Sequence, residues 1–226
     1  MIAPGRSKPG KGLQKDLHDA IRLCSYNDLR RAIQNGADVN SGDYLDKSDF
    51  YPLLQACADS KGLWIVRLLI EHGARVDVRN TSEATPLHIA CFNGRVDSVR
   101  TLIDTGADVG AIDIDGLTPF DDICKSRADV FDETYAEIGD ILISNGADID
   151  SFNLHHACLN IQVNLAQFLL SRGADPMIRD HLDKTPLDIA VDLPQDIPER
   201  EEILDLFREF HPELYFSKFC TMDMRP

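Results

Sequence analysis

The sequence predicts an all-α solenoid in which helix-turn-helix units stack on one another and β-hairpin fingers connect them. Two marks that recur at one period support this prediction. A Leu-x-x-Ala element, with one Phe-x-x-Ile variant, occurs six times with its leading residues 36, 34, 33, 34 and 33 positions apart. A Gly-Ala pair occurs five times, at Gly36, Gly73, Gly106, Gly146 and Gly173. Because two independent marks share a period typical of stacked repeats, they indicate one repeated structural unit.

Each repeat carries local signals for two helices. A hydroxyl residue directly before a proline marks the start of the first helix, at Thr85, Thr118 and Thr185. In the second helix, Val99, Leu102 and Ile103 follow one another at helical spacing and mark a buried stripe. The glycine that follows suits a left-handed C-terminal cap. Each unit is therefore predicted as helix, short turn, helix and extended finger.

The third unit carries the most complete set of marks. It reads Thr85-Pro86-Leu87-His88-Ile89-Ala90 and closes with Gly106-Ala107-Asp108-Val109. This pattern resembles the ankyrin repeat family, whose unit has a T-P-L-H-x-A box and a closing G-A-D-V-N. The resemblance covers about residues 14–210 and implies an ankyrin-repeat solenoid of about six repeats, at 14–45, 46–79, 80–112, 113–150, 151–179 and 180–210.

The two ends and the middle of the chain depart from this pattern. Residues 1–13 are expected to form a flexible basic tail. Residues 211–226 are expected either to fold back as a cap over the last helix pair or to act as a linear motif for a partner. The fourth repeat has about seven extra residues around 127–134, which are either neutral variation in a surface loop or a functional insertion.

Composition narrows the classes of function. The 226 residues include 23 Lys and Arg against 38 Asp and Glu, for a net charge of −15, and 43% are hydrophobic. This apolar fraction suffices for a core. A strongly acidic chain disfavours nucleic-acid binding, and the best apolar run is broken by Arg67, so no membrane insertion is expected. With no secretory signal in the sequence, we expect a cytoplasmic protein, with the nucleus or a host-cell cytosol as alternatives.

The cysteines and histidines recur at equivalent positions of the repeats and are not spaced like the residues of a metal or catalytic site. Cys57, Cys91, Cys124 and Cys158 occupy one equivalent position after the alanine, which suits a small apolar side chain. None of the paired spacing of zinc sites is present, so we expect reduced thiols, no metal and no cofactor. The resemblance implies that His18, His88 and His155 join neighbouring repeats by hydrogen bonds.

No arrangement of nucleophile, base or metal ligands points to catalysis, so the sequence predicts that the chain is not an enzyme. The fourth repeat alone gathers several acids, at Asp121, Asp122, Asp129 and Asp132. No base or ligand group accompanies them. An enzyme with an unrecognised site in this repeat is therefore the weakest alternative.

In ankyrin-like proteins the partner-binding face consists of finger tips and the exposed side of the first helices. Transfer by register gives the candidate partner-binding residues Phe50, Ala58, Asp59, Phe92, Asn93, Ile114, Asp115, Leu117, Lys125, Leu159 and Asn160. Five of these are large apolar residues that should face solvent, and a contiguous patch of such residues indicates an interface. Acids at its edge favour a protein or peptide partner with apolar anchors and basic flanks.

The sequence thus predicts a monomeric, non-catalytic protein–protein interaction module that acts as an adaptor, a scaffold or an inhibitory subunit. An alternative from another class is a secreted pathogen or host-range effector that acts through ankyrin-mediated binding. Trp64 is left with two interpretations: it is either exposed on its second helix or packed against an adjoining helix.

Overall fold

The computed structural model describes residues 11–42, 51–125, 131–150 and 153–222, and these residues form helices joined by turns and loops, with no strand. They divide into two compact units, Met1–Asp122 with Ser144–Gly146, and Ile123–Ile143 with Ala147–Pro226. The helices that begin in the first unit are α1 (Lys11–Arg22), α2 (Tyr26–Gln34), α3 (Pro52–Ala58), α4 (Leu63–Glu71), α5 (Pro86–Phe92), α6 (Val96–Asp104) and α7 (Pro119–Lys125). The second unit contains nearly all of α8 (Glu133–Ser144), together with α9 (Asn153–Leu159), α10 (Val163–Ser171), α11 (Pro186–Asp192), α12 (Pro198–Phe210) and α13 (Pro212–Met222).

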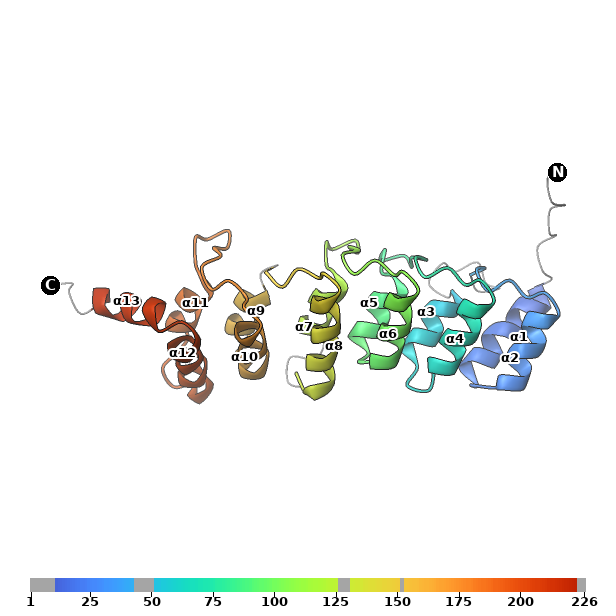
Figure 1. The fold of residues 1–226 in the computed structure, drawn as a ribbon, viewed down its shortest axis with the longest axis horizontal. Helices are drawn as coiled ribbons and strands as arrows, with labels where there is room; N and C mark the ends of the chain where they lie inside the picture. The colour runs from blue at the N-terminus through green and yellow to red at the C-terminus, as the bar shows by residue number, and fades with distance from the viewer. Residues whose placement is uncertain (1–10, 43–50, 126–130, 151–152, 223–226) are drawn as a thin grey trace. The chain divides into compact units, whose positions relative to one another are not determined.

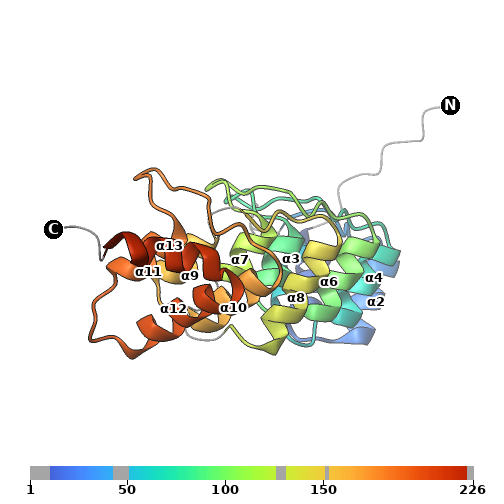
Figure 2. The ribbon, with the colours of Figure 1, turned by 60° about the vertical axis from the view of Figure 1, so that its left-hand side comes forward.

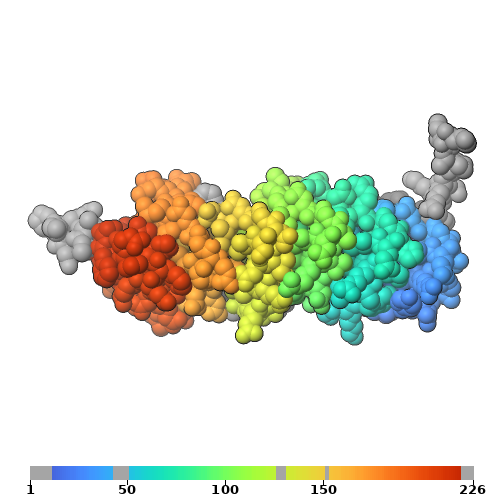
Figure 3. Space-filling view, in the orientation of Figure 1, coloured from blue at the N-terminus to red at the C-terminus, as the bar shows by residue number. Residues whose placement is uncertain are grey.

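In the first unit, successive antiparallel helix pairs stack side by side. Helices α1, α3 and α5 form one row and α2, α4 and α6 form the other (Figures 1 and 2). Each pair buries its apolar stripe against the next, and Leu17, Leu53, Leu87 and Leu102 are fully or almost fully buried. On the face seen in Figure 3, these repeats lie against one another with no open cleft between them. The predicted repeat architecture is confirmed.

In the second unit, α9 packs on α10 and α11, and α12 packs on α10, α11 and α13. Its core includes Leu165, Ile203 and Phe207, which are completely buried. The C-terminal residues expected as a tail form α13, which contacts α12 through Arg208: the guanidinium lies 4.9 Å from the ring centre of Tyr215. Lys218 of α13 also forms an ion pair with Asp188 of α11.

The helix starts follow the predicted chemistry. Thr85 lies before Pro86, and its backbone N–H donates to His88 Nδ1 at 3.2 Å in a reciprocal capping box. Thr185 forms the same kind of box with Asp188, whose carboxylate accepts from the Thr185 backbone N–H at 2.9 Å. Such caps satisfy backbone donors that would otherwise have no partner at the first turn of a helix.

The fingers in the described residues are closed by side chains rather than by strand pairing. In the finger of the fourth repeat, the Asp113 carboxylate accepts from the backbone N–H groups of Asp115 and Leu117, at 2.9 and 2.8 Å. The Asp113 N–H also donates to the Leu117 carbonyl at 2.9 Å. Asn80 and Asp180 close the third and sixth fingers in the same way. These internal bonds restrict the conformations open to the five-residue loop.

The turn between the two helices of a repeat places one residue in the left-handed region. Gly94 takes this conformation with a φ of +65° in the third repeat. Ile161 takes it in the fifth, with a φ of +59°, where a β-branched side chain is strained. This turn leads directly from the end of the first helix to the second helix, so it positions the candidate residues at the helix end.

Candidate functional site

His88 joins the third repeat to the finger of the fourth. Its imidazole is buried, and Nε2 donates to the Leu117 carbonyl at 3.0 Å, while Nδ1 accepts from Thr85. Because a carbonyl oxygen can only accept, Nε2 carries the proton of a neutral ring. Burial lowers the pKa of His88. In the second unit, His155 makes the equivalent bond to the Lys184 carbonyl at 3.0 Å.

Four predicted site residues of the first unit lie at the ends of first helices, and we name Ala58, Asp59, Phe92 and Asn93 the helix-end group. Phe92 ends α5 and its side chain is 51% exposed, and Ala58, which ends α3, is also exposed. Asn93 is less available to a partner, because its Nδ2 donates to the Ile89 carbonyl of its own helix at 2.8 Å. A hollow of about 260 Å³ opens beside this group between Asp59 and Arg95.

Three other predicted residues form what we name the finger group: Ile114, Asp115 and Leu117. Ile114 is 67% exposed and Asp115 is exposed, whereas Leu117 is half-buried. The Ile114 N–H donates to the Ser82 carbonyl at 2.9 Å, which ties this finger to the preceding one. Ile112 is also exposed here and was not among the predicted residues. The repeat register gave no signal for it, because it lies before the finger tip.

The two groups stand at different ends of α5. Leu117 meets His88 near the start of this helix, and Phe92 is its last residue. His88 and Phe92 are four positions apart on the helix, a rise of about 6 Å. The structure therefore arranges the predicted residues of the first unit as two groups, with Leu117 near the start of α5 and Phe92 at its end.

The remaining predicted residues belong to the second unit, where they repeat the same local arrangement. Leu159 ends α9 and is 64% exposed, and Lys125, the last residue of α7, is exposed. Asn160 Nδ2 donates to the His156 carbonyl at 2.9 Å, as Asn93 does to its own helix. A hollow of about 260 Å³ follows at the same register, bounded by Phe131 and the Asn160–Leu165 segment.

The sequence also singled out Phe50, the insertion in the fourth repeat and Trp64. Phe50 and part of the inserted segment of the fourth repeat lie outside the described residues. Trp64 packs against an adjoining helix, since its ring centre lies 5.5 Å from that of Tyr26 in α2.

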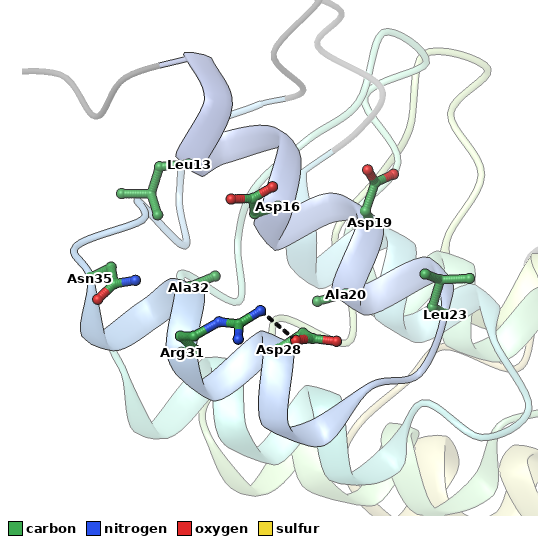
Figure 4. A pocket seen from close by; sticks show the side chains of 9 residues that line it. All are labelled: Leu13, Asp16, Asp19, Ala20, Leu23, Asp28, Arg31, Ala32 and Asn35. Carbon is green, nitrogen blue, oxygen red and sulfur yellow. Dashed lines mark hydrogen bonds and ion pairs between the residues drawn. The ribbon is translucent and has the colours of Figure 1, made fainter.

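A groove on the first repeat was not predicted from the sequence. It runs between α1 and α2 with a volume of about 250 Å³ (Figure 4). Leu13 lies at one end and Leu23 at the other, and Ala20 and Ala32 lie between them. The helical spacing of Leu13 and Ala20 was a usable signal, because it marks one apolar stripe on the first described helix.

The thiols of the cysteine column are buried. Cys57, Cys91, Cys124 and Cys158 are at most 1% exposed, and burial raises the pKa of Cys158 to about 12. Over the described residues, no group of three or more His, Cys, Asp or Glu side chains is arranged to hold a metal ion. In the same part of the chain, no helix combines the length and apolar character required to cross a membrane.

Stacked helix pairs, fingers closed at their tips and a His-to-carbonyl bond between repeats define a helical repeat protein. A family model described as ankyrin repeats, in three copies, matches residues 17–113. Ankyrin repeat and SOCS box protein 16 of Homo sapiens is 30% identical over 218 residues, which cover 93% of this chain and 45% of that protein. Ankyrin repeat protein nuc-2 of Neurospora crassa is 33% identical over 163 residues, covering 69% of this chain and 14% of that protein.

Among solved structures, the ankyrin repeat domain of Bcl-3, a member of the IkappaB protein family, shares the fold with a TM-score of 0.69. It is 24% identical, and the match covers 85% of each chain. The chain belongs to the ankyrin repeat family. It spans less than half the length of the two curated relatives named above. Ankyrin repeats are in general non-catalytic protein–protein interaction modules.

Proposed function

We propose that this chain binds a protein or peptide partner through the helix-end and finger groups of its first unit. The supporting observation is the exposure of Phe92 in the helix-end group and of Ile114 in the finger group. Exposed apolar side chains that gather on one region of a surface favour a binding site over a chance distribution. Binding alone accounts for the proposed role as an adaptor, a scaffold or an inhibitory subunit, with no catalytic step.

The charges around these two groups favour a partner with basic flanks. Asp59 borders the hollow beside the helix-end group, and Asp115 is exposed at the finger tip. Arg95 lies at the same hollow but donates to the Ala58 carbonyl at 3.3 Å, so its charge is held against its own chain. An apolar centre with acidic edges complements apolar anchors next to Lys or Arg. We further propose a cytoplasmic location, in line with the free thiols of the described cysteines.

Two exposed residues provide the test. The double variant Phe92→Ser/Ile114→Ser should reduce capture of the partner from cell extract at least about 10-fold, because interface anchors often contribute 1–2 kcal/mol or more each. Its thermal melt should change little, since both side chains are largely exposed. Capture is quantified by mass spectrometry after affinity purification.

Phe216 provides a matched control. It is 55% exposed on α13, so Phe216→Ser removes a similar apolar surface that belongs to neither the helix-end group nor the finger group. The control should retain the same captured proteins as the unmodified chain. Equal capture by the double variant would overturn the proposed face. A large fall in the melting temperature of the double variant would instead identify Phe92 and Ile114 as packing residues.

A further inference from the structure

The groove between α1 and α2 is built like a surface on which another element packs. Its floor consists of the small residues Ala20 and Ala32, which are 2% and 3% exposed, and Leu23 at one end is 68% exposed. Small residues on a floor with large apolar residues at the ends allow a close approach of another chain segment. Because it lies on the first repeat, no preceding helix pair in the described residues covers it.

The rim of this groove is acidic and only partly neutralised. Asp28 is paired with Arg31 at 2.7 Å, and Asp19 is paired with Arg22 at 2.9 Å. Asp16 is exposed, and no ion-pair or hydrogen-bond partner is found for it within the described chain. The groove lining therefore carries three Asp against Arg31, a surplus of negative charge beside an apolar floor. A suitable occupant combines basic side chains with apolar ones.

Residues 1–10 of this chain have that composition and are joined directly to the groove. They contain Arg6 and Lys8 with no acidic residue, and they begin with Met1 and Ile2. The groove from Leu13 to Leu23 follows ten residues of helix, a length of about 15 Å. Ten extended residues span up to about 33 Å, enough to turn back and reach its far end.

We propose that residues 1–10 dock along this groove, with Arg6 and Lys8 facing the Asp16 and Asp28 rim and the apolar first residues near Leu23. The tether keeps the segment at a high effective concentration, so weak contacts suffice for docking. A second copy of the chain is a poorer occupant, because two acidic grooves that face each other repel. The docked segment caps the first repeat by covering the face on which another repeat would otherwise stack.

The test reverses the basic charges within the intact chain. In the unmodified chain, nuclear Overhauser contacts should connect the Ile2 methyl groups with those of Leu23. In Arg6→Glu/Lys8→Glu these contacts should disappear, and the backbone amides of the segment should exchange with solvent at least 10-fold faster.

The control variant Lys15→Glu/Arg30→Glu changes the net charge equally at two exposed positions that do not line the groove. It should keep both the contacts and the slow exchange. Absent contacts in the unmodified chain, or equal exchange in the reversed and control variants, would overturn the proposal. Contacts that appear only between differently labelled molecules would also overturn it, because the occupant would then be a second copy.

Discussion

At the scale of single residues, His88 shows how one side chain serves two repeats. Its Nδ1 accepts from Thr85, which closes the cap of α5, and its Nε2 donates to the Leu117 carbonyl of the next finger. Burial is the main cause of its lowered pKa, and Arg79 acts in the same direction, while the hydrogen bond to Leu117 and the charges of Asp113 and Asp121 oppose it. The neutral ring is therefore the form that the folded chain requires.

Acid should destabilise the chain partly through His88. Its folded pKa lies below the usual value of 6.5, so the unfolded chain takes up the proton first as the pH falls. The contribution of His88 to stability is then complete above about pH 6.5 and is lost progressively below it. His88→Gln should lower the free energy of unfolding at pH 7.5 by about 1–3 kcal/mol, and stability should fall less steeply between pH 7.5 and 5.5.

Urea unfolding at both pH values measures this difference. Some dependence of the free energy of unfolding on pH should remain in the variant, because burial also lowers the pKa of His156. If the free energy of unfolding of His88→Gln depends on pH as steeply as that of the unmodified chain, His88 does not contribute to the loss of stability in acid.

At the scale of elements, the turn from α3 to α4 depends on one close approach of the backbone. Gly62 precedes α4, and a Cβ added there would lie 2.0 Å from the Ala56 carbonyl oxygen and 3.1 Å from that of Asp59. Both obstacles are backbone atoms, which cannot rotate away as a side chain can. Glycine is required here by space rather than by its dihedral angles, since its φ is −75°.

Gly62→Ala should therefore lower the free energy of unfolding by more than about 2 kcal/mol. Gly12→Ala is the control, because a Cβ at Gly12 in α1 meets nothing within 4 Å. Alanine is the better helix former, so the control should be neutral or gain up to about 1 kcal/mol. The urea midpoints of the two variants give the comparison. A Gly62→Ala protein as stable as the control would mean that this turn relaxes at little cost.

The helix positions could be predicted because their signals are local. Thr85 before a proline and the Val99 and Leu102 stripe act within one or two turns of helix, so the sequence alone reveals them. The closure of the fingers could not be predicted in the same way. It depends on the Asp113 side chain, which accepts from the Asp115 and Leu117 amides instead of leaving the finger to strand pairing.

The candidate site was predictable only in part, for a related reason. The register identified Phe92 and Ile114 as exposed, because their positions are set within one repeat. It could not show that Leu117 is half-buried, since that follows from the bond between its carbonyl and His88 in the preceding repeat. The groove of the first repeat was missed because the register assigns positions within a repeat and does not show which apolar faces the rest of the chain leaves uncovered.

At the scale of the whole molecule, the surplus of acids is the dominant electrostatic property. There are 38 acidic against 23 basic residues, so like charges outnumber the available pairs. The described ion pairs, such as Arg172 with Asp140 at 2.6 Å, are mostly exposed. Each such pair contributes at most about 1 kcal/mol. Net repulsion within the folded chain should therefore outweigh these attractions at low ionic strength.

Added NaCl should raise the melting temperature. Between about 20 mM and 300 mM salt the Debye length falls several-fold, which screens the repulsion among the acids. A gain of about 1 kcal/mol corresponds to a rise of about 2–4 °C for a chain of this size. Calorimetry in NaCl measures this rise in melting temperature. Chloride is used because sulfate would also stabilise the folded chain through its exclusion from the protein surface. A melting temperature that falls with NaCl would show that the ion pairs outweigh the net repulsion.

The four buried cysteines allow local unfolding of the chain to be measured at each repeat. Each unit holds two of these thiols, Cys57 and Cys91 in the first and Cys124 and Cys158 in the second, all at the packing position. A thiol that is both inaccessible and protonated cannot be alkylated until its surroundings open. The labelling rate of each cysteine then reports how often its own repeat separates from its neighbours, without any probe having to be introduced.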